Sequence, residues 1–421
     1  MSEKLKPRLA GLKVRIKPTL KEQEYFRLHF GATRFAYNCC LAYFYSLRQD
    51  TLKTGIKRPP LQKLDLQNWW RFQKDSLIKD GETWLSEVNQ STVRAGAHRA
   101  AFAIEKHVKK LCKKPKFKSK SSHVSARWFQ GIRVIGGRVH ISRQSIRAVW
   151  HKKLPNDAKI KAITISVKAG QWYASILHET STSKKIPNSD KVIGVDLGLA
   201  NIATLSDGTI VKNNRPLQRR LRMLRRKQRR ASRCQKGSNR RKRAQRKVAA
   251  LHAKIANTRL YHAQQLAWLV VNRAQTICLE DLRVSNMAKN AKLARHIHDA
   301  GWYQIRRLIQ ESATKYGRQV VVVPSFFPSS KLCSNCGHKN DQLTLRDRAW
   351  TCPACHTNHD RDLNAAINIR NEGIRISGDG RLPVNDAEGS NKPPAMAGES
   401  DEPSMAAQAA SCLQLTGGTH L

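Results

Sequence analysis

The sequence predicts a multidomain α/β protein. At 421 residues the chain exceeds one ordinary domain, so two or three are expected, and 40% hydrophobic residues suffice for their cores. Hydrophobic residues recur at helical spacing over roughly 21–110 and alternate with polar residues over roughly 122–180. Beyond residue 190, continuous apolar runs and helical patterns both occur, so the second half combines strands with helices.

The first half is expected to form a helical lobe followed by a small β-module. Residues 132–141 form two short runs around a Gly-Gly pair, which favours a hairpin with a two-residue turn. Residues 163–176 alternate on either side of a turn at 169–171, which indicates a second hairpin. A polar stretch over 180–190 separates this half from the next one.

The second half is expected to contain four buried strands and a closing helix. The strands cover residues 191–196, 201–205, 275–280 and 319–324. Helices are expected at 302–316 and at 364–370. Past Asn371 the composition turns to Gly, Pro, Ser and acidic residues with little periodicity, so the tail is expected to be disordered.

The charge of the chain indicates a polyanionic partner. The 78 Lys and Arg against 30 Asp and Glu leave a formal charge of +48, which a compact chain feels as self-repulsion unless a polyanion neutralises it. Nucleic acid is the expected counter-charge. The sequence has no 18-residue apolar run, and the N-terminus lacks the apolar core of a signal peptide. We therefore expect no membrane partner and a cytoplasmic location.

One segment concentrates this positive charge. Residues 211–250 hold eighteen Lys or Arg and no acid, with Leu217, Leu221 and Leu224 at helical spacing. A solvated helix face is the alternative, but such faces usually mix signs for i,i+4 pairing. We therefore expect this helix to contact nucleic-acid phosphates. The candidate contact residues are Arg225, Arg226, Arg229, Arg230, Arg241 and Lys242.

Four of the ten cysteines have metal-ligand spacing. Cys333 and Cys336 form one C-x2-C turn, and Cys352 and Cys355 form another after fifteen residues, which predicts one structural Zn²⁺ with four thiolate ligands. Trp350 is expected to pack against this module. The ligand set is complete without nearby histidines, so we expect His338, His356 and His359 to be bystanders, with substitute ligation as the alternative. The other six cysteines are expected to be ordinary thiols.

Three carboxylates end up together if the apolar strands form an RNase H-like sheet. Asp196 ends the first strand, Glu280 ends the third, and these two strands are neighbours in such a sheet. Asp362 precedes the closing helix, whose small residues allow it to lie close against the sheet. Like charges roughly 4 Å apart repel by about 4 kcal/mol at an effective dielectric of 20, so the cluster needs metal or raised pKa values.

Oxygen ligands of this kind select Mg²⁺ or Mn²⁺. Two such ions can activate water and stabilise the leaving oxygen in a displacement at phosphorus. Taken singly, each acid has another reading: Asp196 as a turn residue, Glu280 as a helix start and Asp362 as a helix N-cap. Residues 194–198 could also form the phosphate loop of an actin-like ATPase, but the zinc pattern and the basic helix argue against it.

In combination these motifs resemble TnpB, the family of compact RNA-guided nucleases encoded by insertion sequences and related to type V CRISPR effectors. The resemblance covers about residues 10–372. By resemblance, Asp196, Glu280 and Asp362 match the split RuvC catalytic triad, with Asp360 as a competitor for the third position. His356 is a departure, because the family usually has glycine after the last cysteine. The matching runs are GATRFAYN at 31–38, IGVDLG at 193–198, LEDL at 279–282, SSKLCSNCG at 329–337 and DRDLNAAINI at 360–369.

The resemblance also implies partners and a domain plan. The partners are a guide RNA and a target double-stranded DNA that carries a short motif beside the cleaved sequence. The implied activity is RNA-guided DNA cleavage with two Mg²⁺ ions; the alternatives are a transposase that joins DNA strands and a catalytically silent RNA-guided regulator. The implied domains are a wedge-like β-domain (1–18 and 115–183), a helical recognition lobe (19–114), a RuvC-like nuclease domain (190–331 and 357–372), a zinc module (332–356) and a disordered tail (373–421).

Overall fold

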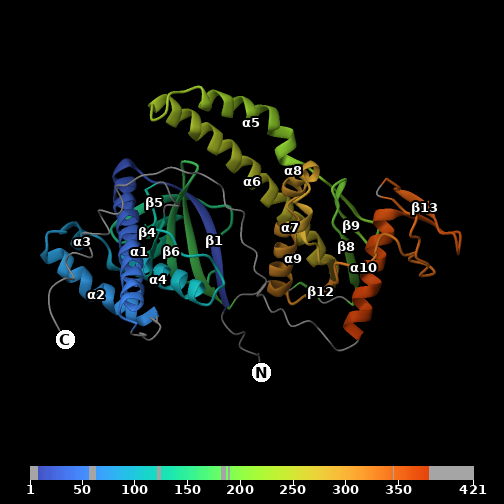
Figure 1. The fold of residues 1–421 in the computed structure, drawn as a ribbon, viewed down its shortest axis with the longest axis horizontal. Helices are drawn as coiled ribbons and strands as arrows, with labels where there is room; N and C mark the ends of the chain where they lie inside the picture. The colour runs from blue at the N-terminus through green and yellow to red at the C-terminus, as the bar shows by residue number, and fades with distance from the viewer. Residues whose placement is uncertain are drawn as a thin grey trace. The chain divides into compact units, whose positions relative to one another are not determined.

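The computed structural model describes residues 8–55, 63–120, 125–181, 186–187, 190–344 and 346–378. The described residues fall into two compact units, the first ending at residue 181 and the second beginning at residue 186 (Figure 1). Each unit has its own hydrophobic core. In the described part of the chain, no helix is both long enough and apolar enough to cross a membrane.

The first unit contains a seven-stranded antiparallel sheet in the order β2-β6-β7-β1-β5-β4-β3. Both hairpins predicted from the sequence, β3–β4 and β6–β7, are confirmed. The hydrophobic pattern does not predict β1 as a strand, although the resemblance places residues 1–18 in the same β-domain as residues 115–183. In the structure, β1 lies between β7 and β5 and so joins the start of the chain to strands far along it. The strands are β1 (Arg8–Lys17), β2 (Ser125–Trp128), β3 (Ile132–Ile135), β4 (Arg138–Ile141), β5 (Gln144–Val149), β6 (Lys159–Lys168) and β7 (Gln171–Thr180).

Helices α1 (Leu20–Thr54), α2 (Lys63–Lys79), α3 (Trp84–Glu87) and α4 (Gln90–Val108) complete this unit, as the helical spacing predicted. A capping box between Thr19 and Glu22 starts α1. Gly96 allows α4 to cross α1 closely, because a Cβ at this position would lie 2.3 Å from the Thr33 carbonyl oxygen. The first turns of α1 pack on the sheet, where the Phe26 ring meets the Trp128 ring at 5.7 Å.

The second unit is built on a five-stranded sheet in the order β10-β9-β8-β11-β12. Strands β8, β11 and β12 are parallel, whereas β9 and β10 run antiparallel at one side. The strands are β8 (Val192–Asp196), β9 (Asn201–Leu205), β10 (Ile210–Lys212), β11 (Thr276–Glu280) and β12 (Gln319–Val323). The helices are α5 (Pro216–Ser232), α6 (Asn239–Arg273), α7 (Val284–Met287), α8 (Ala291–Ala300), α9 (Trp302–Tyr316) and α10 (Arg361–Gly378).

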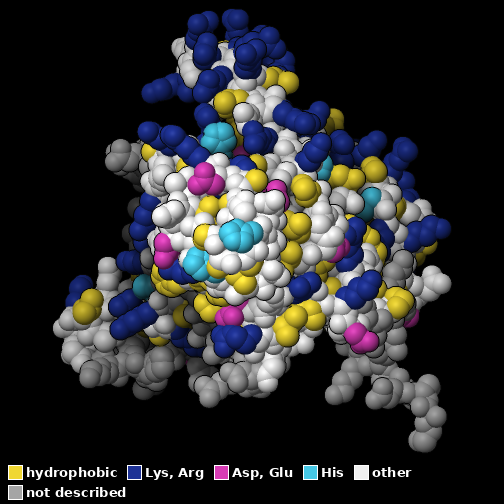
Figure 2. All heavy atoms as spheres, turned by 90° about the vertical axis from the view of Figure 1, so that its right-hand side faces the viewer, with side chains coloured by type: hydrophobic (Ala, Val, Ile, Leu, Met, Phe, Trp, Pro, Cys, Tyr) yellow, Lys and Arg dark blue, Asp and Glu magenta, His cyan; other side chains and the backbone are white. Residues whose placement is uncertain are grey.

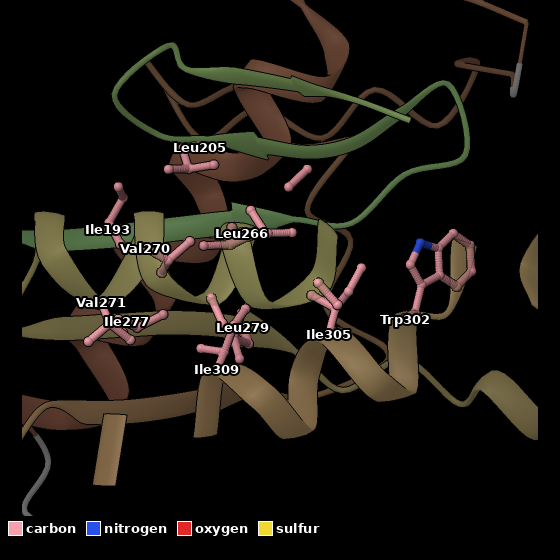
Figure 3. Packing of buried hydrophobic residues seen from close by; sticks show 14 of the residues in the cluster. Ile193, Leu205, Leu266, Val270, Val271, Ile277, Leu279, Trp302, Ile305 and Ile309 are labelled. Carbon is pink, nitrogen blue, oxygen red and sulfur yellow. The ribbon is translucent and has the colours of Figure 1, made fainter. Parts of the chain in front are cut away.

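The two faces of this sheet are covered by different helices. Ile277 and Leu279 of β11 point to one face, where they pack with residues of α6 and α9 such as Val270 and Ile309 (Figure 3). Cys278, between them in the strand, belongs to the other face and packs with residues of β12 and α10. The buried strands thus read as continuous apolar runs because both faces are covered.

The closing helix approaches the sheet closely at two glycines. A Cβ on Gly194 of β8 would lie 2.0 Å from the Ala366 carbonyl oxygen of α10, and a Cβ on Gly373 would lie 2.2 Å from Cys278 Sγ. Neither position tolerates a side chain unless the helix moves. Glycine at position 194 is therefore what allows α10 to lie directly on β8.

The sequence placed the end of α10 too early. This helix runs to Gly378, so the expectation of disorder is wrong for residues 373–378, whereas residues 379–421 lie outside the described part of the chain. The reason is packing, because Ile376 lies against the core of the α10 face and Gly373 permits contact with Cys278. An ion pair of 2.8 Å between Arg375 and Glu372 also supports this last turn.

Candidate active site and zinc module

The structure brings the three predicted acids to one edge of the second sheet. Val195 of β8 is level with Leu279 of β11, so Asp196 and Glu280 leave the ends of adjacent parallel strands together. Asp362 lies in the first turn of α10, which crosses β8 at Gly194. All three side chains are partly buried.

The electrostatics of this edge show that the three acids interact. The pKa of Asp196 is raised to about 7, first by burial and then by the nearby carboxylates of Glu280 and Asp362, against the opposite effect of Arg361 and of a hydrogen bond from the Leu197 backbone N–H. The pKa of Glu280 is also raised to about 7, first by burial and then by Asp281. Near neutral pH these two acids are therefore a mixture of protonated and ionised forms, as is typical of buried carboxylates at functional sites.

The donor set fits Mg²⁺ or Mn²⁺, because only carboxylate oxygens are offered. Two such ions about 3.5–4 Å apart can share a set of carboxylates of this kind.

The structure also separates the roles of Asp360 and Asp362. Asp360 Oδ1 accepts a hydrogen bond of 2.9 Å from the Leu363 N–H, so Asp360 stabilises the start of α10. Asp362 lies close enough to Asp196 to raise its pKa, and its carboxylate is 3.6 Å from Arg348. The cap position suggested for Asp362 as an alternative is therefore occupied by Asp360.

The four predicted zinc ligands come together between β12 and α10. Cys333 Sγ lies 3.5 Å from Cys355 Sγ, and Cys336 Sγ lies 3.6 Å from Cys352 Sγ. Thiolates arranged tetrahedrally around Zn²⁺ at about 2.3 Å stand roughly 3.8 Å apart, so the cluster fits this ion. Trp350 of β13 (Ala349–Thr351) packs on Cys333 and Cys352, as predicted.

The two cysteine turns have the same backbone geometry. Gly337 N–H donates to the Cys333 carbonyl, and His356 N–H donates to the Cys352 carbonyl, each at 2.9 Å. Gly337 has φ +76° and His356 has φ +55°, so both occupy the left-handed region that favours glycine. The departure at His356 thus leaves the turn intact but places a strained residue in it.

His359 contacts the cluster, contrary to the expectation that it would be a bystander. Its Nε2 lies 3.0 Å from Cys333 Sγ, and its ring lies 4.8 Å from the Trp350 ring. His359 is buried in β14 (Asn358–Asp360), which pairs with β13. A histidine N–H donated to a metal-bound thiolate would orient this ligand.

Two asparagines that the sequence analysis overlooked tie the zinc module to α10. Asn364 Oδ1 accepts from Ser334 N–H at 2.9 Å, and Asn364 Nδ2 donates to the Leu332 carbonyl at 2.7 Å. Asn368 Nδ2 donates to the Leu332 and Ser329 carbonyls at 2.7 and 2.8 Å. Both amides are buried, and the signal for them was two polar residues at i,i+4 on an otherwise apolar helix face.

The basic segment forms an antiparallel helical hairpin of α5 and α6. Leu224, Leu251 and Ile255 pack between the two helices. At its base, buried Asp299 accepts hydrogen bonds from the Leu217 and Gln218 N–H groups of α5 and an ion pair from Arg259. This acid therefore supplies the cap that the N-cap residue of α5 does not provide.

Most of the predicted phosphate-binding cations face solvent on this hairpin. Lys and Arg cluster at the top of Figure 2, where the hairpin lies. No carboxylate pairs with a cation of residues 212–250 in the parts of the chain that the structure describes. Arg241 differs, because its guanidinium donates to the Cys234 carbonyl and stabilises the hairpin tip. The exposed ones are Arg225, Arg226, Arg229, Arg230 and Lys242.

Comparisons with known proteins agree with this architecture. Residues 175–291 match the OrfB_IS605 family, described as "Probable transposase", and residues 302–369 match the "Cas12f1-like, TNB domain" family. Residues 8–56 match a "Helix-turn-helix domain" family, although the structure has a strand followed by one uninterrupted helix there. A Cas12f1 structure in complex with guide RNA and target DNA matches with a TM-score of 0.53, 15% identity and coverage of 84% of this chain and 83% of that one.

The class that the fold defines is thus a mixed α/β multidomain protein with the fold of Cas12f1 and a zinc-ribbon-like module. A "Putative RNA-guided DNA endonuclease" of Streptomyces pristinaespiralis is 37% identical over 71% of this chain and 76% of the relative. InsQ of Escherichia coli K12, which carries the same description, is 28% identical over 89% and 95%. The chain belongs to the TnpB family, as its motifs predicted.

The raised pKa of Asp196 predicts that Asp196→Asn increases the free energy of unfolding by an amount that depends on pH. The pKa of about 7 in the folded protein lies above the ordinary value near 3.9. The folded state is therefore not penalised by this acid below about pH 4, where the acid is neutral in both states, and it loses stability as the pH rises through 7. Without Mg²⁺ but with zinc retained, Asp196→Asn should raise the free energy of unfolding at pH 8 by roughly 1–3 kcal/mol and change it little at pH 4.

Thermal melting at the two pH values measures this effect. Asp360→Asn is the matched control, because asparagine caps a helix about as well as aspartate and should change little at either pH. A loss of stability at pH 8 in Asp196→Asn would contradict the assignment of a buried, repelled carboxylate.

The strained turn predicts that His356→Gly stabilises the zinc module. Glycine adopts the left-handed conformation without the cost of about 1 kcal/mol that a side chain brings, so the variant should gain roughly 0.5–1 kcal/mol. It should retain zinc against a higher chelator concentration, measured by competition with a chromophoric chelator. His338→Gly, at a neighbouring position without positive φ, should show no gain. Equal behaviour of the two variants would rule out backbone strain.

Proposed function

We propose that this protein is an RNA-guided DNA endonuclease of an insertion sequence, which cleaves target DNA by two-metal-ion hydrolysis. The observation that carries the proposal is the meeting of Asp196, Glu280 and Asp362 at one sheet edge, where Glu280 and Asp362 both raise the pKa of Asp196. The names of the relatives support the guide RNA and the DNA substrate. The +48 charge of the chain suits both nucleic acids.

The strand order supports an RNase H-like, RuvC-type nuclease domain. The three parallel strands β8, β11 and β12 lie beside the antiparallel strands β9 and β10. Asp196 and Glu280 are the last residues of the neighbouring parallel strands β8 and β11. In this proposal, Asp196, Glu280 and Asp362 hold the two ions, which would supply an activated water and a stabilised leaving oxygen. Asp196 and Glu280, whose pKa values are raised to about 7, would lose their protons near neutral pH and so be ready for cations, since metal ions bind the ionised form.

The rest of the chain would bind and orient the nucleic acids. We assign the sheet of the first unit to a wedge-like domain and helices α1 to α4 to a recognition lobe. In RNA-guided systems base pairing reads the sequence, whereas the protein recognises shape and a short flanking motif. The exposed cations of the α5–α6 hairpin would hold phosphates near the nuclease domain.

A transposase that joins DNA strands is the second candidate, because the matching family is described as "Probable transposase". The same three acids could serve strand transfer. This candidate predicts joined DNA products and no requirement for RNA. A silent regulator, the third possibility, would bind without cutting, although the presence of all three acids favours an active enzyme. Sequencing of the RNA that co-purifies with the protein separates guided from unguided functions.

The proposal predicts that binding and cleavage separate on mutation of the triad. Asp196→Ala, Glu280→Gln and Asp362→Ala should keep near-normal affinity for guide RNA and target, because the basic surfaces provide that energy. Cleavage should fall by about a thousandfold or more, since losing 4 kcal/mol of transition-state stabilisation slows a step by that factor. The measurements are single-turnover cleavage in Mg²⁺ and binding in Ca²⁺.

Asp360→Ala is the control for this series. It removes the helix cap but no proposed metal ligand, so its cleavage defect should be far milder. If Asp196→Ala cuts at close to the wild-type rate, the assigned active site is wrong.

The hairpin assignment predicts a change in the salt dependence of binding. Replacing Arg225, Arg226, Arg229 and Arg230 with Gln should weaken binding of duplex DNA and reduce the slope of log K against log salt by about 0.9 for each lost phosphate contact. Arg241→Gln is the comparison, because this side chain is engaged at the hairpin tip and should affect folding more than the slope. An unchanged slope in the fourfold variant would mean that the helix face is merely solvated.

A further inference from the structure

An exposed aromatic side chain lies in the loop that follows β12. Phe326 is 81% exposed, the largest exposed fraction among the exposed aromatic rings of the described residues. It occupies the third position of a turn in which the Phe327 N–H donates to the Pro324 carbonyl at 3.1 Å. Asn, Asp and Gly favour such positions, whereas an exposed phenyl ring there stabilises neither the turn nor a core.

The loop that carries Phe326 is held firmly. Phe327, the next residue, packs against the core formed by Cys278, Val321 and Val323. Pro324 and Pro328 bracket the turn, and Ser329 N–H donates to the Phe327 carbonyl at 2.8 Å. The exposed ring is therefore presented on a fixed backbone, so little ordering entropy would be lost if a ligand bound it.

The register of the sheet places this ring beside the acidic cluster. Glu280 of β11 pairs with Val323 of β12, and both strands run parallel. Arg283 follows Glu280 by three residues and Phe326 follows Val323 by three, so both lie in loops that leave the same edge. Three residues span at most about 10 Å, which keeps Arg283 close to Glu280.

The two loops meet at these side chains. The Arg283 guanidinium lies over the Phe326 ring, 5.0 Å from its centroid. Arg283 is exposed and forms no ion pair with a carboxylate in the described residues, unlike Arg306, which pairs with Asp281 nearby. One exposed ring and one exposed positive charge thus form a pair at the rim of the candidate active site.

We propose that Phe326 is a stacking platform for a nucleobase of a single-stranded segment whose phosphate reaches Asp196 and Glu280, with Arg283 holding the ring and an adjacent phosphate. This inference rests on the proposed nuclease function and deepens it, because it specifies the form in which the nucleic acid enters the site. Every base has a face that can stack, so the platform selects for unpaired strands and not for sequence. In a duplex that face is covered by neighbouring base pairs.

Photocrosslinking tests where the strand lies without requiring cleavage. Full-length protein as purified is mixed in Ca²⁺ with a DNA single strand that contains 5-iodouracil, irradiated and digested, and the crosslinked peptides are identified by mass spectrometry. We expect a crosslink on the peptide that contains Phe326. Crosslinks confined to other peptides would overturn the proposal.

A substitution series tests stacking itself. At a salt concentration that suppresses non-specific phosphate contacts, Phe326→Ala should bind the single strand about tenfold more weakly, whereas Phe326→Tyr and Phe326→Trp should bind like wild type. Phe326→Leu keeps apolar surface without an aromatic face and should resemble Phe326→Ala. Wild-type affinity in the Leu variant would overturn stacking.

Trp268→Ala provides the matched control. Trp268 is a partly exposed aromatic of α6 that contacts Tyr316, near the opposite ends of the strands, and its loss should leave the Phe326 crosslink unchanged. If Phe326→Ala lowers the melting temperature by several degrees and leaves binding unchanged, the ring is a packing contact within the protein and the proposal fails.

The outcome is independent of the triad experiment. Crosslinking and affinity in Ca²⁺ can show stacking even if Asp196→Ala still cuts, which would overturn only the nuclease assignment. Conversely, if the triad variants lose cleavage and no Phe326 crosslink forms, the nuclease assignment stands and the proposed stacking role of Phe326 is wrong.

Discussion

The contact of α10 with β8 at Gly194 is the constraint on which the rest of the second unit depends. The helix can lie on the strand only because no Cβ separates them. That contact brings the first turn of α10, and with it Asp362, to the strand ends that carry Asp196 and Glu280. A small displacement of the helix would therefore separate acids that are distant in sequence, although no side chain of the triad had changed.

The zinc module also helps to hold α10 in position. Leu332 and Ser334, which flank the ligand Cys333, are hydrogen-bonded to Asn364, and Leu332 also to Asn368. A structural zinc held by the four cysteines would fix the module, and these buried amides would then fix α10 relative to it. The module thus has a mechanical connection to the candidate active site without contributing a ligand to it. This explains how an insertion between β12 and α10 can remain compatible with a precise site.

Charge in this protein is divided between two tasks. In our proposal the exposed arginines of the hairpin attract phosphates over long distances. The acids are few and partly buried, and they gather where the pKa values of Asp196 and Glu280 are raised. A polyanion approaching a cluster of carboxylates would be repelled unless cations intervened. In this proposal, affinity comes from the basic surfaces and chemistry from the acids, on separate residues, and the exposed Phe326 ring at the rim would orient the strand.

The sequence by itself determined the features whose signal is local. The four-cysteine spacing, the β3–β4 hairpin around its glycines and the helix at Trp302–Tyr316 depend on neighbouring residues, and all three appear as predicted. Asp196 and Glu280 end their strands as expected, because a strand end is itself a local feature, whereas the motif left Asp360 as a competitor to Asp362. Composition also led to a wrong expectation of disorder for residues 373–378, where the helix continues because it contacts the sheet. Only the tertiary structure decided the position of β1 between β7 and β5, the His359 contact with Cys333, the hydrogen bonds of the two asparagines and the Arg283–Phe326 pair. Each of these joins residues that are separated along the chain, and local propensity carries no information about which distant groups folding will bring into contact.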